Sequence, residues 1–213
     1  MLGSLMKTKR FNGPVAAAFL VALSFFTALN ASAVIVTNGD FETLTAANPV
    51  GTYLTVNNSA TTITGWSVGN ISVDVVNGAY NAISGNSIDL AGTPGPGSLS
   101  QTFTLAAGSY QLSFDLGRNT DDAPYANVVL GSTNFGTKIG GTGATFIHYV
   151  LPYVSAGGAT TLSFTNLGTP GGGILDNVSV TAVPEPENYA MMLAGLGLIG
   201  FVAHRRAKRG ATA

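Results

Sequence analysis

The stretch YQLSFDL, residues 110–116, decides the fold class, because its apolar residues occupy every other position. A period of two is what a β-strand with one buried side and one wet side requires, and it differs from the 3.6-residue period of an amphipathic helix. The same kind of pattern recurs between clusters of Gly, Pro, Asn and Ser, at residues 71–76, 99–105, 127–130, 145–151, 160–165 and 175–180. Many short strands with frequent turns predict an all-β fold, a β-sandwich of the jelly-roll type.

The N-terminus has the parts of a secretory signal peptide. A basic start precedes an apolar region at residues 15–29, and Ala31-Ser32-Ala33 supplies the small residues that signal peptidase accepts. We therefore predict a signal helix and signal peptide at residues 1–33, cleaved after Ala33. Met6 is an alternative start to Met1, because the basic residues follow it directly. A buried N-terminal helix is the competing interpretation.

The C-terminus places another apolar stretch beside positive charge. Residues 189–203 are apolar, and a helix of that length covers about 22 Å of a hydrocarbon layer about 30 Å thick. Arg205 and Arg206 follow, and basic residues beside an apolar helix favour leaving that end in the cytoplasm. We predict a Pro/Glu linker at 182–188, a short transmembrane helix at 189–203 and a basic cytoplasmic tail at 204–213.

The region between the two ends is acidic. It has two basic residues against eight acidic ones, a net charge of −6, whereas the whole chain has a net charge of −1. A surface of this kind repels phosphate backbones, so nucleic acid is excluded as a partner. About 150 residues suit one domain with a hydrophobic core, and we assign residues 34–181 to it. The chain has no cysteine, so disulfides do not stabilise this domain.

The ingredients of an enzyme are missing from the same region. His148 is its only histidine and lies in the middle of an expected strand, and Glu42 is its only glutamate. It has no Gly-x-Ser-x-Gly motif and no evident pair of carboxylates of the kind that glycosidases use. We predict no enzymatic activity and no required cofactor, with a polysaccharide hydrolase as the weaker alternative.

Three carboxylates predict a metal site. Strand alternation in residues 175–180 places Asp176 on the buried side, where a charge needs a partner, and Asp40 and Glu42 alternate with Phe41 near the mature N-terminus. If the first and last segments of the domain pair, these carboxylates would share one hard cation, and Ca²⁺ suits such oxygen ligands. In the alternative, Asp176 caps backbone N–H groups in a turn while Asp40 and Glu42 are solvated. Both interpretations fit the sequence.

Six motifs stand in the order seen in secreted galactose-binding-like domains: residues 38–42 (NGDFE), 65–68 (GWSV), 73–76 (VDVV), 85–90 (GNSIDL), 100–103 (SQTF) and 175–178 (LDNV). Residues 34–180 most closely resemble the bacterial choice-of-anchor C family, which is related to a plant cell-wall family of unknown function. The resemblance implies a jelly-roll sandwich. It also implies a structural calcium ion at Glu42 and Asp176, as in carbohydrate-binding relatives. Tyr80 and Tyr149 stand where related sequences often carry Trp.

The chain end VPEP, residues 183–186, is followed by a short apolar helix and an Arg-rich end, and it resembles the PEP-CTERM sorting signal, also called the VPEP ice-binding protein C-terminal domain. Pro184, Glu185, Pro186, Arg205 and Arg206 carry that likeness. It implies export across the inner membrane of a Gram-negative bacterium and recognition by an exosortase. It further implies cleavage near the Pro-Glu-Pro and association with exopolysaccharide or biofilm matrix. A permanent C-terminal anchor is the alternative that the residues alone allow.

The combined prediction is a non-catalytic surface or matrix protein that binds exopolysaccharide. The most polar loop of the domain, residues 117–125, offers the candidate contacts, which are Arg118, Asn119, Asp121 and Tyr125, together with Tyr80. The alternative for that loop is a solvated turn. The alternative for the whole protein is a structural or adhesive envelope protein with no defined sugar ligand.

Overall fold

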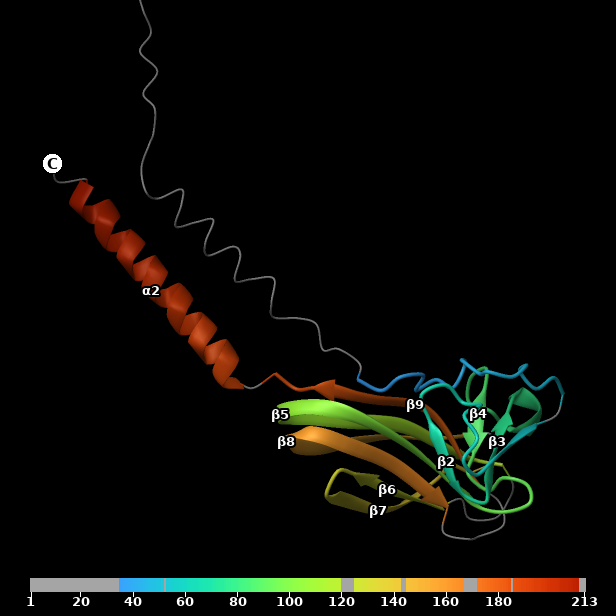
Figure 1. Ribbon diagram of the computed structural model, residues 1–213. Coiled ribbons are helices and arrows are strands. Elements are labelled where there is room, and N and C mark those ends of the chain that lie inside the picture. Colours follow the sequence, from blue (N-terminus) through green and yellow to red (C-terminus); the bar gives the residue numbers. More distant parts are fainter. Residues whose placement is uncertain are drawn as a thin grey trace, which may run out of the picture. The chain divides into compact units, whose positions relative to one another are not determined.

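The structure is a computed structural model that describes residues 35–51, 53–119, 125–142, 145–166, 172–184 and 186–210. The predicted signal peptide, with Ala31 and Ala33, therefore lies outside the described residues. In chain order the elements are β1 (Leu54–Asn57), β2 (Ser67–Asn70), β3 (Ser72–Val76), the 3₁₀-helix η2 (Gly78–Tyr80), β4 (Ser87–Asp89), β5 (Gly97–Arg118), β6 (Tyr125–Leu130), β7 (Thr133–Ile139), β8 (Ile147–Asn166), β9 (Gly173–Ala182) and the helix α2 (Pro186–Gly210). The domain before α2 is built from strands, which confirms the all-β prediction (Figure 1).

Two long strands, β5 and β8, organise the domain. They pair antiparallel from Ser98 opposite Thr165 to Leu116 opposite Ile147. The prediction of separate strands at 99–105 and 110–116 was therefore wrong, because both lie in β5, and 145–151 and 160–165 likewise both contribute to β8. Gly157 and Gly158 in the middle of β8 have φ angles of 93° and 103°, which residues with a side chain rarely adopt. At these two glycines the β5–β8 strand pair can bend while the two strands stay paired.

The bend folds the β5–β8 pair back on itself. Phe164 of β8 lies opposite Leu99 of β5, and Leu99 is fifteen positions from Phe114 along β5. In a straight strand, fifteen positions span about 50 Å. Yet the rings of Phe114 and Phe164 lie 5.1 Å apart. The two halves of the pair therefore belong to two layers, one with β2, β6 and β7 and the other with β1, β3, β4 and β9 (Figure 1).

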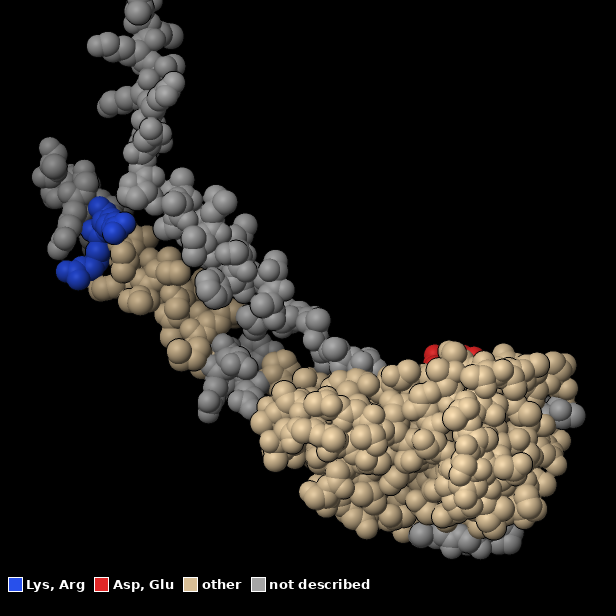
Figure 2. Space-filling view, viewed as in Figure 1, with Lys and Arg blue, Asp and Glu red and all other residues tan. Residues whose placement is uncertain are grey.

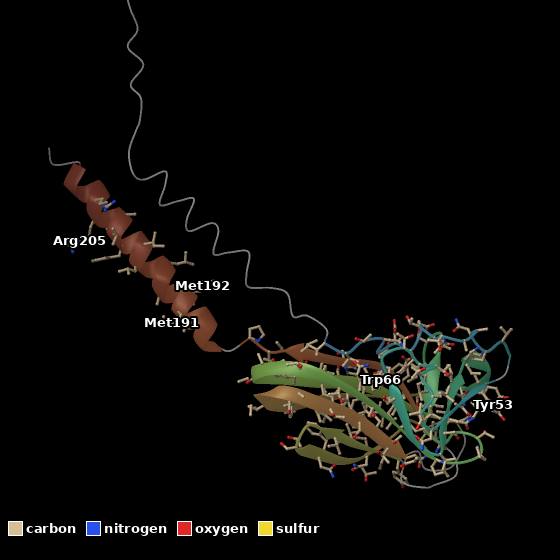
Figure 3. The ribbon with its side chains drawn as sticks, in the orientation of Figure 1. Tyr53, Trp66, Met191, Met192 and Arg205 are labelled. Atoms are coloured by element: carbon tan, nitrogen blue, oxygen red, sulfur yellow. The ribbon has the colours of Figure 1, made fainter. Side chains whose placement is uncertain are left out.

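The space between the layers is filled by aromatic and aliphatic side chains. Phe41, Phe114 and Phe164 are fully buried, and Trp66 packs against both Phe41 and Phe164. Figure 3 labels Trp66 within the sandwich. The Trp66 indole donates a hydrogen bond from Nε1 to the Asn38 carbonyl at 2.9 Å, so its one polar atom is satisfied inside the core. Packing of this kind holds the domain together without disulfides.

The N-terminal segment runs beside the last strand, as we expected. Ile35 N donates to Val180 O at 3.1 Å, and Val178 N donates to Gly39 O at 2.8 Å. Residues 38–42 nevertheless form a turn and not a strand, because Asn38 and Phe41 have φ angles of 52° and 56°. The Asn38 side chain closes this turn through hydrogen bonds with Thr43 and with the Thr64 carbonyl. The turn brings Glu42 close to β9.

Helix α2 carries exposed apolar side chains along its length, including Met191 at 74% and Leu193 at 64% (Figure 3). It continues to Gly210, so the predicted separate tail from residue 204 begins as helix. Within the described residues, no helix has both the length and the apolar character to cross a membrane. This includes α2, where we predicted a transmembrane helix at 189–203.

Charge is distributed as the sequence indicated. The face of the sandwich seen in Figure 2 shows no Lys or Arg, whereas basic side chains gather on α2. Arg205 places its guanidinium 5.6 Å from the centre of the Phe201 ring, one turn earlier on the helix. Positive charge in the described part of the chain is thus concentrated after the apolar stretch, the arrangement that the C-terminal pattern predicted.

Candidate ligand-binding site

A bulge in β9 builds the polar centre of the domain. Ser113 of β5 lies opposite Ser179 and Asp115 lies opposite Asp176, so β9 has one residue more than β5 between these pairs. Asn177 takes the resulting conformation, with a φ of 51°, which Asn tolerates better than most residues. Because of the bulge, the side chains of Asp176 and Asn177 and the backbone of Val178 reach three different segments of the chain.

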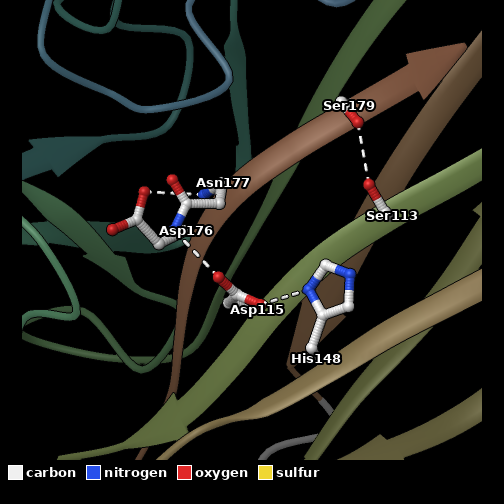
Figure 4. Close-up of polar contacts among 6 residues, drawn as sticks. All are labelled: Ser113, Asp115, His148, Asp176, Asn177 and Ser179. Atoms are coloured by element: carbon white, nitrogen blue, oxygen red, sulfur yellow. Dashed lines mark hydrogen bonds and ion pairs between the residues drawn. The ribbon is translucent and has the colours of Figure 1, made fainter.

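Asn177 joins β9 to a carboxylate–histidine pair. Its Nδ2 donates to Asp115 Oδ2 at 2.8 Å, and Asp115 Oδ1 lies 2.6 Å from His148 Nδ1 on β8 (Figure 4). The Asp115 side chain is 9% exposed, whereas the His148 side chain is 57% exposed. A carboxylate at Nδ1 favours the tautomer that carries its proton there, which leaves Nε2 as an acceptor. Within the described residues Nε2 has no hydrogen-bond partner.

Asp176 caps the turn between η2 and β4. Its Oδ2 accepts hydrogen bonds from Ser84 N at 3.2 Å and from Ser87 Oγ at 3.0 Å, and its Oδ1 accepts one from Asn177 N at 2.7 Å. Burial raises the pKa of Asp176 to about 6, although these hydrogen bonds act to lower it. The nearby charge of Glu42 also acts to raise this pKa. The buried position that we predicted for Asp176 is confirmed, since 1% of the residue is exposed.

Glu42 holds the same turn from its other side. Its Oε1 accepts a hydrogen bond from Asn86 N at 2.8 Å, and its charge acts on Asp176. The structure thus brings Glu42 and Asp176 together. Two neighbouring carboxylates suit a hard cation in their chemistry, while the hydrogen bonds to Asp176 are those of the capping alternative.

Asp40 does not join this pair as a third metal ligand. It is exposed, and in the part of the chain that the structure describes no three His, Cys, Asp or Glu residues form a group that could hold a metal ion. The prediction placed Asp40 and Glu42 on the side opposite Phe41, and the structure agrees, because Phe41 is buried and both carboxylate residues are exposed.

A small pocket opens close to the Asp115–His148 pair. Its volume is about 170 Å³, and its lining consists of Gly78, Asn81, Ala82, Ile83, Gly117, Thr145 and Phe146. Gly117 shares a face of β5 with Asp115, two residues earlier, and Phe146 precedes His148 by the same interval. Among the described residues, none that lines the pocket carries a charged side chain, and Phe146 is an exposed aromatic residue at 47%.

Two of the residues that we predicted as ligand contacts, Asn119 and Tyr80, adjoin this pocket without being part of its lining. Asn119 Nδ2 donates to Asp89 Oδ2 at 2.8 Å, and the Asn119 carbonyl accepts from Asn81 Nδ2 at 3.1 Å, so Asn119 fixes one wall of the pocket. Tyr80 packs edge-on against Tyr53, with ring centres 5.5 Å apart.

The other predicted contacts lie elsewhere. Arg118 ends β5 half-buried and is not part of the pocket lining. Tyr125 begins β6 opposite Ile139, and Asp121 falls outside the described residues. Sequence analysis missed Asn81 and Phe146, because more than sixty positions separate them in the chain. The available signal was the exposed aromatic residue just before a long strand.

Comparison of the whole chain with known proteins finds no similar sequence among curated proteins. Several solved structures are similar in shape. A family 35 carbohydrate-binding module from Clostridium thermocellum has a TM-score of 0.42 at 13% identity, covering 62% of this chain and 99% of that one. The CBM36-1 domain of a xylanase from the hindgut metagenome of Trinervitermes trinervoides has a TM-score of 0.43 at 14% identity, covering 63% and 98%. TmCBM61 in complex with β-1,4-galactotriose has a TM-score of 0.45 at 14% identity, covering 71% and 100%. Similarities this weak do not transfer a ligand to this chain.

The C-terminal end matches a family model for the PEP-CTERM protein-sorting motif over residues 182–206. The match contains Pro184, Pro186, Arg205 and Arg206, and it also contains Glu185, which lies outside the described residues. A proline-rich entry, an apolar helix and a basic end thus coincide in one short segment. The chain carries a PEP-CTERM protein-sorting motif, which implies export and membrane anchoring before processing by an exosortase-type enzyme.

Proposed function

We propose that this protein is an exported, non-catalytic surface protein of a Gram-negative bacterium, released by an exosortase into the exopolysaccharide or biofilm matrix. Its β-sandwich binds a neutral sugar unit of that polysaccharide in the pocket beside Phe146. The observation that carries the proposal is this pocket, in a domain delivered to the cell surface by a sorting motif.

The lining of the pocket suits a sugar. Sugar rings have apolar C–H faces and polar edges, and binding sites for small molecules combine apolar or aromatic walls with a few polar groups. Phe146 supplies the aromatic wall, and Asn81 and Thr145 supply amide and hydroxyl groups. Gly78 and Gly117 present backbone without side chains, so a ligand can approach closely. Because no described residue of the lining carries a charged side chain, a neutral sugar fits this part of the pocket better than an anionic one.

The size of the pocket bears on the ligand. Its volume of about 170 Å³ is below that of sites for drug-sized molecules. One sugar unit therefore fills it, with the rest of the polysaccharide extending over the surface. Weak binding of single units, repeated over many copies, suits a matrix protein.

A non-catalytic role follows from the polar centre. Asp115 and His148 form a carboxylate–histidine pair, but Ser113 Oγ, the hydroxyl two positions along β5, shares its hydrogen bond with Ser179 Oγ at 2.8 Å. Nucleophilic catalysis requires a hydroxyl group that is hydrogen-bonded to the histidine, which acts as its base. Both carboxylate oxygens of Asp115 are already hydrogen-bonded, one to His148 and one to Asn177. This leaves Asp115 unsuited to act as the general acid or base of a glycosidase.

Calcium is the second part of this proposal. Glu42 and Asp176 are neighbouring carboxylates whose charges repel, and a cation would relieve that repulsion. Ca²⁺ is the hard cation of extracellular modules. It would stabilise the turn that both residues hold next to η2 and take no part in a reaction.

The pocket is tested by affinity electrophoresis of the protein as it is recovered from producing cells, in gels that contain the exopolysaccharide of the same bacterium. We expect retardation of the wild type and a loss of about tenfold in affinity for Phe146→Ala. Val154→Ala is the matched control, since Val154 is an exposed apolar residue of β8 outside the pocket. No retardation of a folded wild type would favour the structural or adhesive alternative.

A further inference from the structure

Two further aspartates lie side by side in the sheet, away from Glu42 and Asp176. Asp74 of β3 is directly opposite Asp89 of β4. Side chains at directly opposite positions point to the same face of an antiparallel pair, with their Cβ atoms about 5 Å apart. Asp74 is 5% exposed and Asp89 is 3% exposed, so neither carboxylate is in open contact with water.

Protein donors satisfy only part of this pair. Asp74 Oδ2 accepts hydrogen bonds from Thr93 N at 3.1 Å and from Thr93 Oγ1 at 2.9 Å. Asp89 Oδ1 accepts one from Ala91 N at 2.8 Å, and Asp89 Oδ2 accepts one from Asn119 Nδ2 at 2.8 Å. The fourth oxygen, Asp74 Oδ1, is buried and has no hydrogen-bond partner. Among the described residues, no Lys, Arg or His forms an ion pair with either carboxylate.

A positive partner would satisfy Asp74 Oδ1 and offset the charge of the pair at the same time. Like charges directly opposite one another destabilise a strand pair, and a buried charge without a counter-charge is strongly unfavourable. The donors that reach Asp74 and Asp89 in the described part of the chain bond to the other three oxygens. A free cation is the partner that a domain exported to the cell surface can take from its surroundings.

We propose that Asp74 and Asp89 hold a hard divalent cation, with Ca²⁺ as the expected ion, at a site separate from Glu42 and Asp176. Two carboxylates on one face form the charged part of the ligand set, and Ca²⁺ accepts backbone carbonyls and water for the remainder. The backbone packs tightly around Asp89, because a Cβ atom on Gly172 would collide with Asp89 Oδ1 and with Ala91 N. Glycine at that position is therefore needed for the Asp89 carboxylate to fit beside the backbone.

The cation would hold together parts of the chain that meet here. Asp74 is bonded to the turn at Thr93, and Asp89 is bonded to Asn119 at the end of β5. The Asn119 carbonyl in turn holds Asn81 at the pocket. An ion between the aspartates therefore stabilises β3, β4 and one wall of the pocket. This proposal does not depend on whether that pocket binds sugar.

The test is calorimetric titration of the full chain, after treatment with EDTA, with Ca²⁺ alone. We expect Asp74→Asn to lose one bound Ca²⁺, or to bind it at least about tenfold more weakly, whereas Glu42→Gln keeps it. Asparagine keeps the shape of aspartate and removes the repulsion, so in EDTA Asp74→Asn should be at least as stable as the wild type. That stability also shows that the variant folds.

Three results would overturn the proposal. The first is an Asp74→Asn variant that binds as much Ca²⁺ as the wild type with the same affinity. The second is a single Ca²⁺ in the wild type that Glu42→Gln abolishes. The third is a wild type whose stability depends on pH in EDTA and does not respond to added Ca²⁺, since the aspartates would then share a proton.

Discussion

At the scale of single residues, this domain keeps several acidic side chains in places where water does not reach them. Asp74, Asp89, Asp115 and Asp176 are all buried. Each accepts hydrogen bonds from a turn, a bulge or a neighbouring strand, so each connects segments that lie far apart in the chain. Buried carboxylates of this kind make the stability of the fold sensitive to pH and to cations.

The first prediction concerns pH in the absence of metal. Burial raises the pKa of Asp89 to about 6, above its ordinary value of 3.8, and Asp176 is raised in the same direction for the same reason. The folded state therefore binds protons more tightly than the unfolded state between these values, and stability falls as the pH rises through that range. In EDTA we expect the protein to be more stable at about pH 5 than at about pH 7.5. Asp89 alone should contribute about 1 kcal/mol to this difference in the free energy of unfolding.

Urea unfolding at the two pH values measures this difference. Asp89→Asn is the control, and it should reduce the difference because it removes one of the two groups. Greater stability of the wild type at the higher pH in EDTA would contradict the prediction.

The second prediction concerns Gly39 in the N-terminal turn. A Cβ atom on Gly39 would collide with the Val178 carbonyl, while Val178 N donates to the Gly39 carbonyl at 2.8 Å. Gly39→Ala should therefore separate the turn from β9 and cost about 2 kcal/mol or more. Gly78→Ala is the matched control, because no atom lies within 4 Å of its added Cβ. Equal melting temperatures for the two variants would contradict this close approach.

At the scale of elements, the bend in the β5–β8 pair decides how the layers form. Gly158 has a φ of 103°, and no atom lies within 4 Å of a Cβ added there. Gly158→Ala therefore tests backbone strain alone, without a steric collision.

For Gly158→Ala we expect a loss of about 1–3 kcal/mol in the free energy of unfolding, measured by denaturant titration. Gly195→Ala in α2 is the control, since its added Cβ also meets nothing and alanine favours helix over glycine. If both variants unfold at the same denaturant concentration as the wild type, the bend does not depend on glycine.

At the scale of the whole molecule, the sorting motif determines where the sandwich works. Exosortase-type processing predicts that the mature protein lacks both the signal peptide and the residues after about Pro186. Intact mass of protein recovered from the cell surface checks both ends at once. Mature protein that keeps its tail through Ala213 would contradict processing and support a permanent anchor.

A variant separates sorting from folding. Pro184→Ala with Pro186→Ala changes the motif at two positions that are not among the core residues. We expect this variant to fold normally and to stay with the membrane fraction at its full mass, apart from the signal peptide. Release of the variant to the surface at wild-type levels would show that these prolines are dispensable.

The sequence by itself determined the fold class, the buried position of Asp176 and the sorting motif. Each depends on a local pattern, such as the alternation in residues 110–116 or the order of proline, apolar and basic residues at the C-terminus. Local patterns survive in any tertiary context, because they reflect which side of one element is buried.

Only the tertiary structure decided which of these residues meet. The alternation of apolar residues predicted two strands where β5 is one continuous strand. A bend at glycine interrupts the apolar pattern while the strand stays hydrogen-bonded to β8 on both sides of the bend. The alternation could not place Asn81 beside Phe146 or Asp74 opposite Asp89, and it could not foresee the bulge in β9. Register and bulges are set by packing between distant segments, and no short stretch of sequence contains both partners.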